Sequence, residues 1–370
     1  MALRTLLLPV PIVLALQVIA QKPDAARMKV EEGIALHDKQ DYKKAIKKYD
    51  EALELDQENG LAMAEKALSL SAMGRNEEAA ALCQEIIRVK DGAKGMPMVY
   101  VTYGNCMDAL GRPEAALQVY DQGIKVMPDL SMLHFNKGIT LLSMDSLAGA
   151  DRALQASARL APFHPGTQNA MATLLQAQQN NVPAVLALCR FLVIEPEGAR
   201  AEGNTARLLG LMAGNTTHDK KGNMTISVDA SRLTALEDTT PRPNDFRRSE
   251  MHMELVGGLG AAAAISRALK KEGLDAPTSS ATDLNMQLQS LSSSLKEARP
   301  KGFGFYWDYH ATWFLELEKA GHLEVLSHLA VVSKQERSVS DWLEQNRQAV
   351  DDYYSWEKDY TARMLQARKE

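Results

Sequence analysis

A fixed spacing runs through the first half of this chain of 370 residues. Alanine recurs in similar local surroundings at five positions: Ala45, Ala79, Ala116, Ala150 and Ala184. The successive separations are 34, 37, 34 and 34 residues. The one longer interval contains a Gly-Ala-Lys-Gly stretch at 92–95, which is typical of a widened loop. A period of this length predicts stacked copies of one small helical unit.

Two further sets of residues recur at fixed distances from these alanines. Twelve residues before each alanine lies a small residue: Gly33, Ala67, Gly104, Gly138 and Ala172. Four residues after each alanine lies a core-type side chain: Tyr49, Cys83, Tyr120, Leu154 and Leu188. A small residue on one helix lets a second helix approach closely, so each unit is predicted to be a pair of packed helices. Proline at 128, 162 and 196 is expected to end the second helix of its pair.

Period and residue types together resemble the tetratricopeptide repeat over about residues 26–197, as in Gly33…Tyr42…Ala45…Tyr49…Ala52-Leu53. The chain departs from that pattern at Gln57 and Asp91, which replace the terminating proline. The resemblance implies an all-α fold, a tetratricopeptide-type α-solenoid in which helix pairs form a right-handed superhelix. A further helix at about 199–212 is expected to cap the stack, which places the solenoid at 26–213.

The resemblance also implies that the first helix of each pair lines a concave surface that binds another protein. Helical spacing places the following residues on that surface: Val30, Ile34, Leu61, Leu68, Met98, Val101, Asn105, Met132, Phe135, Ile139 and Leu142. Repeats that clamp a C-terminal carboxylate carry Lys, Asn and Arg there, whereas this set is apolar except for Asn105, so that binding mode is rejected. An apolar surface of this extent needs a partner. We expect a peptide or an amphipathic helix, supplied by another protein or by the chain's own C-terminal region in cis.

The first twenty residues have the pattern of a secretory signal peptide. Arg4 precedes an apolar run that ends in Val18-Ile19-Ala20, with cleavage expected before Gln21. The run is short for a membrane span and contains two prolines, so no stable span is expected after cleavage. An uncleaved anchor or a buried helix is the alternative interpretation. Cleavage would make the protein extracytoplasmic, either periplasmic or secreted.

The three cysteines lie in helix-favouring segments of the repeat region. A disulfide between Cys83 and Cys106, in successive helices, requires close approach of their Cβ atoms. Buried free thiols are the preferred interpretation for these two and for Cys189, because free Cys is among the most buried residue types.

The second half of the chain begins with a polar stretch at 214–246, which is interpreted as a linker, and continues as a helical region at 247–370. All four tryptophans and twelve of the 21 aromatic residues lie after residue 300. These aromatic side chains either form a helical core or line a site for a sugar, a peptide or another planar ligand. The candidate residues for such a site are Tyr306, Trp307, Tyr309, His310 and Trp313.

The sequence contains no pattern typical of a catalytic or cofactor site. His322 and His328 are six residues apart, which is not the spacing of a zinc-binding helix. No phosphate-binding loop, nucleophile elbow or reactive-cysteine signature is present, so we expect no catalysis, no cofactor and no bound metal. A formal net charge of −5 argues against a nucleic-acid partner. The predicted function is therefore that of an exported scaffold, and the alternative is an enzyme or small-ligand binder that uses the aromatic C-terminal region.

Overall fold

The computed structural model describes residues 10–89, 96–214, 216–218, 224–226, 240, 242–256, 279–298 and 303–367. Residues 1–9 of the expected signal segment, the loop at 92–95 and most of the expected linker lie outside this part of the chain. Among the described residues, no helix combines the length and the apolar character needed to cross a bilayer.

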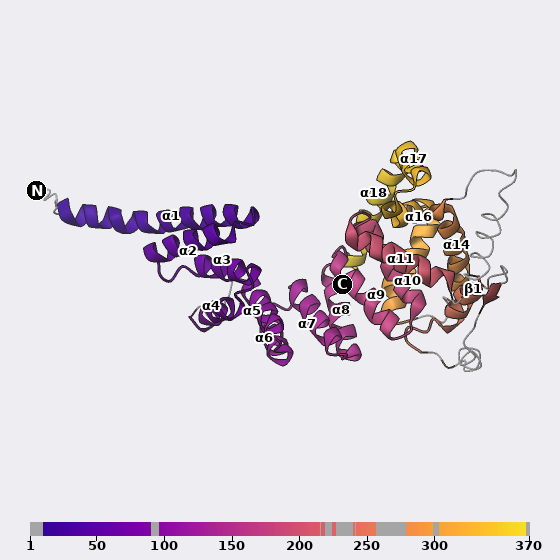
Figure 1. Cartoon of the computed structure of the whole chain (residues 1–370), viewed down its shortest axis with the longest axis horizontal. Helices are drawn as coiled ribbons and strands as arrows, with labels where there is room; N and C mark the ends of the chain where they lie inside the picture. Colours follow the sequence, from indigo (N-terminus) through magenta and orange to yellow (C-terminus); the bar gives the residue numbers. More distant parts are fainter. Residues whose placement is uncertain are drawn as a thin grey trace, which may run out of the picture. The chain divides into compact units, whose positions relative to one another are not determined.

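Consecutive helix pairs form the repeat region (Figure 1). In the first helix of each pair the bounds are α1 Val10–Asp38, α3 Gly60–Ala72, α5 Met98–Ala109, α7 Ser131–Ser143 and α9 Pro165–Ala177. In the second helix they are α2 Tyr42–Leu55, α4 Asn76–Val89, α6 Pro113–Val126, α8 Leu147–Leu160 and α10 Asn181–Ile194. A single helix, α11 (Ala199–Ala213), follows. The predicted all-α repeat fold is confirmed, and α1 also includes residues 10–20 of the expected signal segment.

The turn inside each pair is built the same way five times. A residue in the left-handed backbone region follows the first helix at Gln40, Gly74, Gly111, Asp145 and Gln179. The next amide then donates back to a carbonyl five residues earlier, as from Arg75 to Leu70 at 2.9 Å and from Arg112 to Met107 at 2.9 Å. This is the Schellman motif, which satisfies carbonyls at a helix end. Its recurrence shows that the sequence period is a structural period.

The chain divides into two compact units, 1–153 and 154–370. In unit 1, the small residue and the large residue of a repeat meet as the sequence predicts. A Cβ atom built on Gly104 would lie 2.1 Å from a ring carbon of Tyr120, and one on Gly33 would lie 2.3 Å from the ring of Tyr49. Glycine is therefore required at both positions for the helices to pack.

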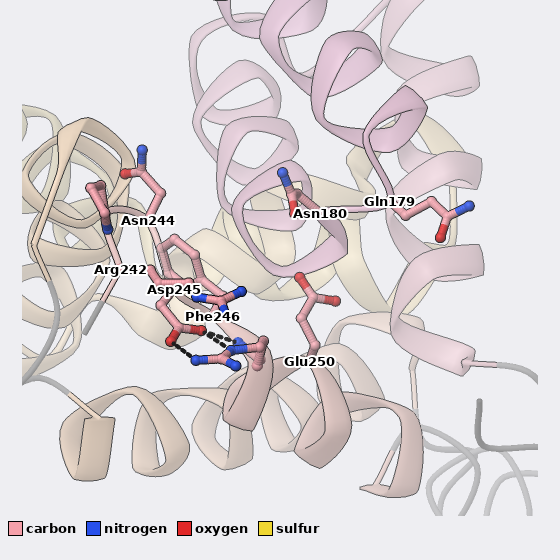
Figure 2. Close-up of a pocket in the computed structure, with 9 residues that line it drawn as sticks. Gln179, Asn180, Arg242, Asn244, Asp245, Phe246 and Glu250 are labelled. Carbon is pink, nitrogen blue, oxygen red and sulfur yellow. Dashed lines mark hydrogen bonds and ion pairs between the residues drawn. The ribbon is translucent and has the colours of Figure 1, made fainter. Parts of the chain in front are cut away.

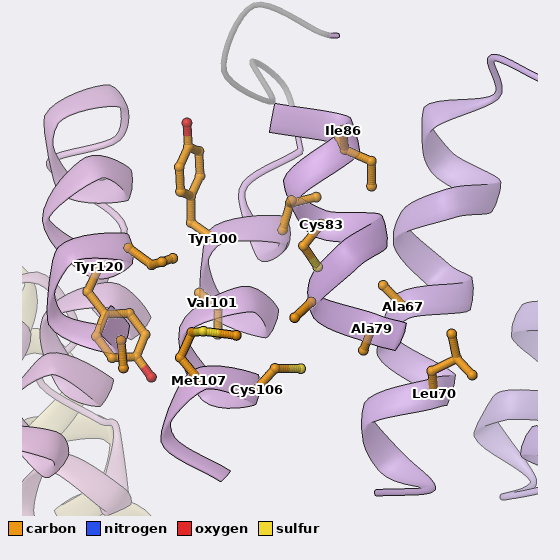
Figure 3. Packing of buried hydrophobic residues seen from close by; sticks show 14 of the residues in the cluster. Ala67, Leu70, Ala79, Cys83, Ile86, Tyr100, Val101, Cys106, Met107 and Tyr120 are labelled. Carbon is orange, nitrogen blue, oxygen red and sulfur yellow. The ribbon is translucent and has the colours of Figure 1, made fainter. Parts of the chain in front are cut away.

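Unit 1 has an apolar core between successive pairs (Figure 3). Cys83 and Cys106 belong to this core as fully buried free thiols, and Cys189 of unit 2 is also free and buried. Burial raises the pKa of Cys83 to about 12, so its thiol stays protonated and unreactive at neutral pH. Along the unit, the first helices contact one another in order, α1 with α3, α3 with α5 and α5 with α7.

Unit 2 joins the last repeat to the C-terminal region. Helical segments of that region are 247–256, α14 Ser280–Ala298, η2 Trp307–Ala311, α15 Thr312–Lys319, α16 Leu323–Val331, η3 Val332–Lys334, α17 Arg337–Gln345 and α18 Arg347–Gln366. Two short antiparallel strands, β1 Thr216–His218 and β2 Met224–Ile226, lie between α11 and this region. Helix α10 is enclosed by α9, α11, α16 and η2, and every residue from 182 to 193 is buried. The C-terminal region thus forms one compact unit with the fifth repeat.

Candidate functional site

The residues predicted to bind a partner lie on the first helices of unit 1, and we refer to them as the inner row: Val30, Ile34, Leu61, Leu68, Met98, Val101, Asn105, Met132, Phe135, Ile139 and Leu142. Because α1, α3, α5 and α7 contact one another successively, their shared face is continuous within the unit. Leu61, Met98 and Ile139 are 47%, 45% and 40% exposed, so large apolar side chains on this shared face are accessible to solvent. Asn105 is exposed, and five others are half-buried: Ile34, Leu68, Met132, Phe135 and Leu142.

Two members of the inner row are not accessible. Val30 and Val101 are only 1% and 2% exposed, and each belongs to an apolar core cluster. Val30 packs in a cluster that also contains Tyr49 and Ala62. Their side chains therefore hold the repeats together and are unavailable as anchors, which corrects the expectation for these two residues. Helical spacing identifies the face of a helix but not how deeply each residue on that face is covered.

A hydrogen-bond network joins the third and fourth repeats beside the inner row. The Tyr120 hydroxyl lies 2.8 Å from Asn105 Oδ1 and 3.1 Å from Asp108 Oδ2. From α7, Asn136 Nδ2 donates to Asn105 Oδ1 at 2.9 Å and Thr140 Oγ1 donates to Asp108 Oδ2 at 2.5 Å. Burial and the neighbouring Asp108 carboxylate raise the pKa of Tyr120, so its hydroxyl remains a donor. These bonds fix the orientation of the exposed Asn105 side chain.

Three carboxylates outside the inner row lie on the same helix faces, and helical spacing had already predicted this position for Asp108. Asp38 follows Ile34 by four residues, Glu65 precedes Leu68 by three, and Asp108 follows Asn105 by three. The same i+3 and i+4 spacing that predicts the inner row also identifies Asp38 and Glu65, which the sequence-based prediction did not include. Burial raises the pKa of Glu65, the nearby Asp38 acts in the same direction, and His37 opposes them.

The fifth repeat carries a different, polar inner face within unit 2. Arg207 of α11 donates to Asn169 Oδ1 at 2.9 Å, to Gln176 Oε1 at 3.0 Å and to Thr173 Oγ1 at 3.2 Å. Its guanidinium also donates to Asn204 Oδ1 at 2.7 Å. Thr173 remains exposed, while the C-terminal helices pack on α10 and α11. The capping helix therefore covers part of this face through one arginine.

The proposed C-terminal aromatic site is packed closed. Tyr306 and Trp307 are 3% exposed, and Tyr309, His310 and Trp313 are fully buried. Arg190 of α10 lies 4.6 Å from the Tyr309 ring centroid and 5.1 Å from that of Trp313. His310 Nε2 lies 2.9 Å from Gln168 Oε1, and burial together with Arg190 holds the pKa of His310 well below its usual range. The structure brings the five predicted residues together as core and not as the lining of an open site.

An open pocket lies beside this aromatic core (Figure 2). It has a cavity volume of about 240 Å³ and is lined by Gln179, Asn180, Arg242, Pro243, Asn244, Asp245, Phe246, Arg247 and Glu250. Its charges are already engaged: Arg247 Nη2 is 2.6 Å from Asp245 Oδ2, and Glu250 Oε1 accepts the Val182 amide at 2.6 Å. Glu250 thereby caps the N-terminus of α10. Asp245, Arg247 and Glu250 in this pocket are therefore engaged in contacts that stabilise the fold.

Metal-binding side chains are dispersed in the described part of the chain. No group of three or more His, Cys, Asp or Glu residues is positioned there to hold an ion. His328 instead stacks on Trp342, with ring centroids 3.8 Å apart, and burial lowers its pKa. A neutral imidazole in this position serves packing.

Comparison with known proteins agrees with the helix-pair geometry. Residues 35–134 match the model of the psidin N-terminal tetratricopeptide-repeat region. A curated relative, the STIP1 homologue of Dictyostelium discoideum, is 34% identical over 98 residues, which is 26% of this chain and 17% of that protein. This chain therefore spans less than a fifth of that relative's length.

Similar solved structures cover about half of the chain. TTC0263, a thermophilic tetratricopeptide-repeat protein of Thermus thermophilus, is 18% identical with a TM-score of 0.43, over 50% of this chain and 98% of that one. PilF of Pseudomonas aeruginosa is 20% identical with a TM-score of 0.43, over 52% and 90%. YrrB, described as having an unusual peptide-binding site, is 19% identical with a TM-score of 0.37, over 49% and 91%.

Proposed function

Because this chain carries tetratricopeptide repeats, we propose that it is a scaffold that holds a segment of a partner protein along the inner row of unit 1. The observation that carries this proposal is the set of exposed and half-buried apolar side chains on four successive first helices. Apolar side chains that share one continuous face mark interaction sites more often than isolated ones do. A helical or extended segment with its own apolar face would cover them.

We also propose that the chain acts by binding and not by turnover. The aromatic residues of the C-terminal region are buried, and the open pocket beside them contains charges paired for structural purposes. An active site needs reactive groups with access to a substrate. The enzyme alternative requires an accessible site among the C-terminal aromatic residues. In the described part of the chain, these side chains are instead packed in the interior.

The binding proposal predicts loss of partner capture when the exposed inner row is made polar. Leu61→Gln combined with Ile139→Gln should reduce capture of the partner from the native cell extract by more than about tenfold, because the variant removes two large apolar contacts and places amides against the partner's apolar residues. Both positions are at least 40% exposed, so helicity by circular dichroism should not change. Capture is quantified by mass spectrometry of proteins retained on the immobilised full chain.

A matched control uses Val89→Gln with Val126→Gln. These residues are 48% and 45% exposed on the second helices α4 and α6, so the control makes the same change of polarity away from the inner row. Capture by this control should equal that of the unaltered chain. If the control loses the partner to the same degree, or if the inner-row variant keeps it, the inner row is not the binding surface.

We further propose that the protein is exported, on the support of the signal pattern in residues 1–20. N-terminal sequencing of the protein recovered from its native cells should then give Gln21 as the first residue. Arg4→Glu should slow this processing several-fold, because signal recognition favours a positive start. Recovery of the unprocessed chain as the main species would contradict export by cleavage.

A further inference from the structure

The cationic side chains of α3, α5 and α7 form ion pairs with the second helix of the preceding repeat. Within α3, α5 and α7 the only lysines or arginines are Lys66 and Lys137. Lys66 Nζ lies 2.5 Å from Asp50 of α2, and Lys137 Nζ lies 2.5 Å from Asp121 of α6. Each lysine is thus neutralised by the second helix of the preceding repeat. Neither leaves a free positive charge beside the inner row.

Three carboxylates beside the inner row, Asp38 of α1, Glu65 of α3 and Asp108 of α5, have no such ion-pair partner among the described residues. Asp38 is exposed, and Glu65 and Asp108 are half-buried. In the described part of the chain, none of the three forms an ion pair with a lysine or arginine. Asp108 accepts hydrogen bonds from the neutral hydroxyls of Tyr120 and Thr140, which leave its charge uncompensated. The inner row is therefore an apolar surface flanked by three carboxylates that no lysine or arginine of the described residues pairs with.

We propose that the partner segment of this surface is basic and amphipathic, with lysine or arginine beside its apolar residues. This inference rests on the proposed scaffold function and adds the chemistry of the partner. Charge complementarity sets partner choice and rate of association, and like charges placed opposite one another reject wrong partners. An acidic segment would meet Asp38, Glu65 and Asp108, and the lysines of these helices are already paired with other carboxylates.

Partial burial makes Glu65 and Asp108 more effective than ordinary surface charges. Glu65 has lost part of its hydration in the unliganded protein, so a lysine or arginine from the partner would restore a favourable contact. Ion pairs that are shielded from water are also less weakened by salt than exposed ones. The apolar residues Leu61 and Leu68 lie on the same helix as Glu65, so one amphipathic segment would contact all three.

The test compares two synthetic peptides of about 18 residues with the same leucine pattern at helical spacing. One peptide carries Lys at its polar positions and the other carries Glu. Binding to the full chain is measured by fluorescence anisotropy at about 50 mM and 500 mM salt. We expect the Lys peptide to bind at least about tenfold more tightly than the Glu peptide at low salt, with the difference shrinking at high salt.

Variants identify the carboxylates responsible. Asp38→Asn with Glu65→Gln should weaken binding of the Lys peptide by about three- to tenfold, and Asp108→Asn should act in the same direction. The matched control, Glu77→Gln with Glu114→Gln, removes the same charge from exposed positions on the second helices and should change the affinity by less than about twofold. If the control weakened binding of the Lys peptide equally, the net charge of the protein would explain the result, and the inference would be overturned. Arg207→Gln, on the polar face of unit 2, should leave binding unchanged or strengthen it.

The two levels of proposal fail in different ways. Equal or tighter binding of the Glu peptide overturns the basic partner, while sensitivity of that binding to the uncharged Leu61→Gln with Ile139→Gln would still support the scaffold function. Binding of the Lys peptide that is insensitive to Leu61→Gln with Ile139→Gln overturns the inner row as the site. Failure of both peptides to bind, with partner capture intact, overturns the basic amphipathic class and leaves the scaffold function standing.

Discussion

Replacing Glu357 with leucine should lower the free energy of unfolding of unit 2 by about 3–5 kcal/mol, the largest loss expected for a single substitution in this chain. Glu357 Oε1 lies 3.4 Å from Arg190 Nη2, with both side chains almost fully buried. Glu357 Oε2 also accepts the Trp313 indole N–H at 2.6 Å. Without the carboxylate, an arginine that remains charged at any ordinary pH would lie buried without its counter-ion. Denaturant unfolding followed by tryptophan fluorescence measures the change, because all four tryptophans lie in this unit.

A double variant separates loss of charge balance from loss of packing. Arg190→Met with Glu357→Leu removes both charges and keeps similar volume, so it should recover most of the stability lost in the single variant. The free energy of unfolding of Glu357→Gln should lie between that of Glu357→Leu and that of the double variant, since glutamine can still accept the hydrogen bond from Trp313. If the double variant is as unstable as Glu357→Leu alone, the ion pair is not the cause of the destabilisation.

Gly104→Ala should destabilise unit 1 by about 1–3 kcal/mol, although alanine normally favours a helix. The added methyl group would lie 2.1 Å from a ring carbon of Tyr120, which is itself fully buried and cannot move aside freely. The loss should appear as a lower melting temperature of the helical signal. The unfolding slope in denaturant should stay the same, because the folded surface does not change.

The control for this prediction is Gly203→Ala on α11. No atom lies within 4 Å of a Cβ built there, so the same substitution should stabilise its helix by about 0.5–1 kcal/mol. If Gly104→Ala destabilises and Gly203→Ala stabilises the protein, the contact with Tyr120 determines the effect of the added methyl group. Stabilisation at Gly104 would mean that the helices of the third repeat are not packed as closely as described.

The repeat geometry was predictable because it depends on contacts close in sequence. Gly104 and Tyr120 are sixteen residues apart, and their contact recurs as Gly33 with Tyr49, so self-comparison was sufficient to identify it. The left-handed residue in each turn was less clearly marked in the sequence. Glycine marks this position at 74 and 111, whereas Gln40, Asp145 and Gln179 adopt it without that marker.

The depth of the inner row and the C-terminal packing were not predictable in the same way. Val101 and Met98 both fit the predicted face, but one is 2% exposed and the other 45%, because coverage depends on the neighbouring repeats. The aromatic residues after 300 were compatible with a core or with an open site. In the structure these residues form a core, with contacts such as that between Gln168 and His310, which are 142 residues apart. The sequence period gives no information about contacts at this separation.

Because α10 is enclosed in part by helices that are far away in the sequence, the two units should differ in when their packing contacts can form during synthesis. Unit 1 is held by contacts between neighbouring pairs, so each pair can form soon after it leaves the ribosome. Helix α10 must wait, because Arg190 meets Tyr309 119 residues later and Glu357 167 residues later. At about 5–20 residues per second, that interval is on the order of ten seconds, during which the part of the α10 surface that later packs on η2 and α16 is uncovered. The last repeat is therefore the point at which a nascent chain most needs protection from aggregation.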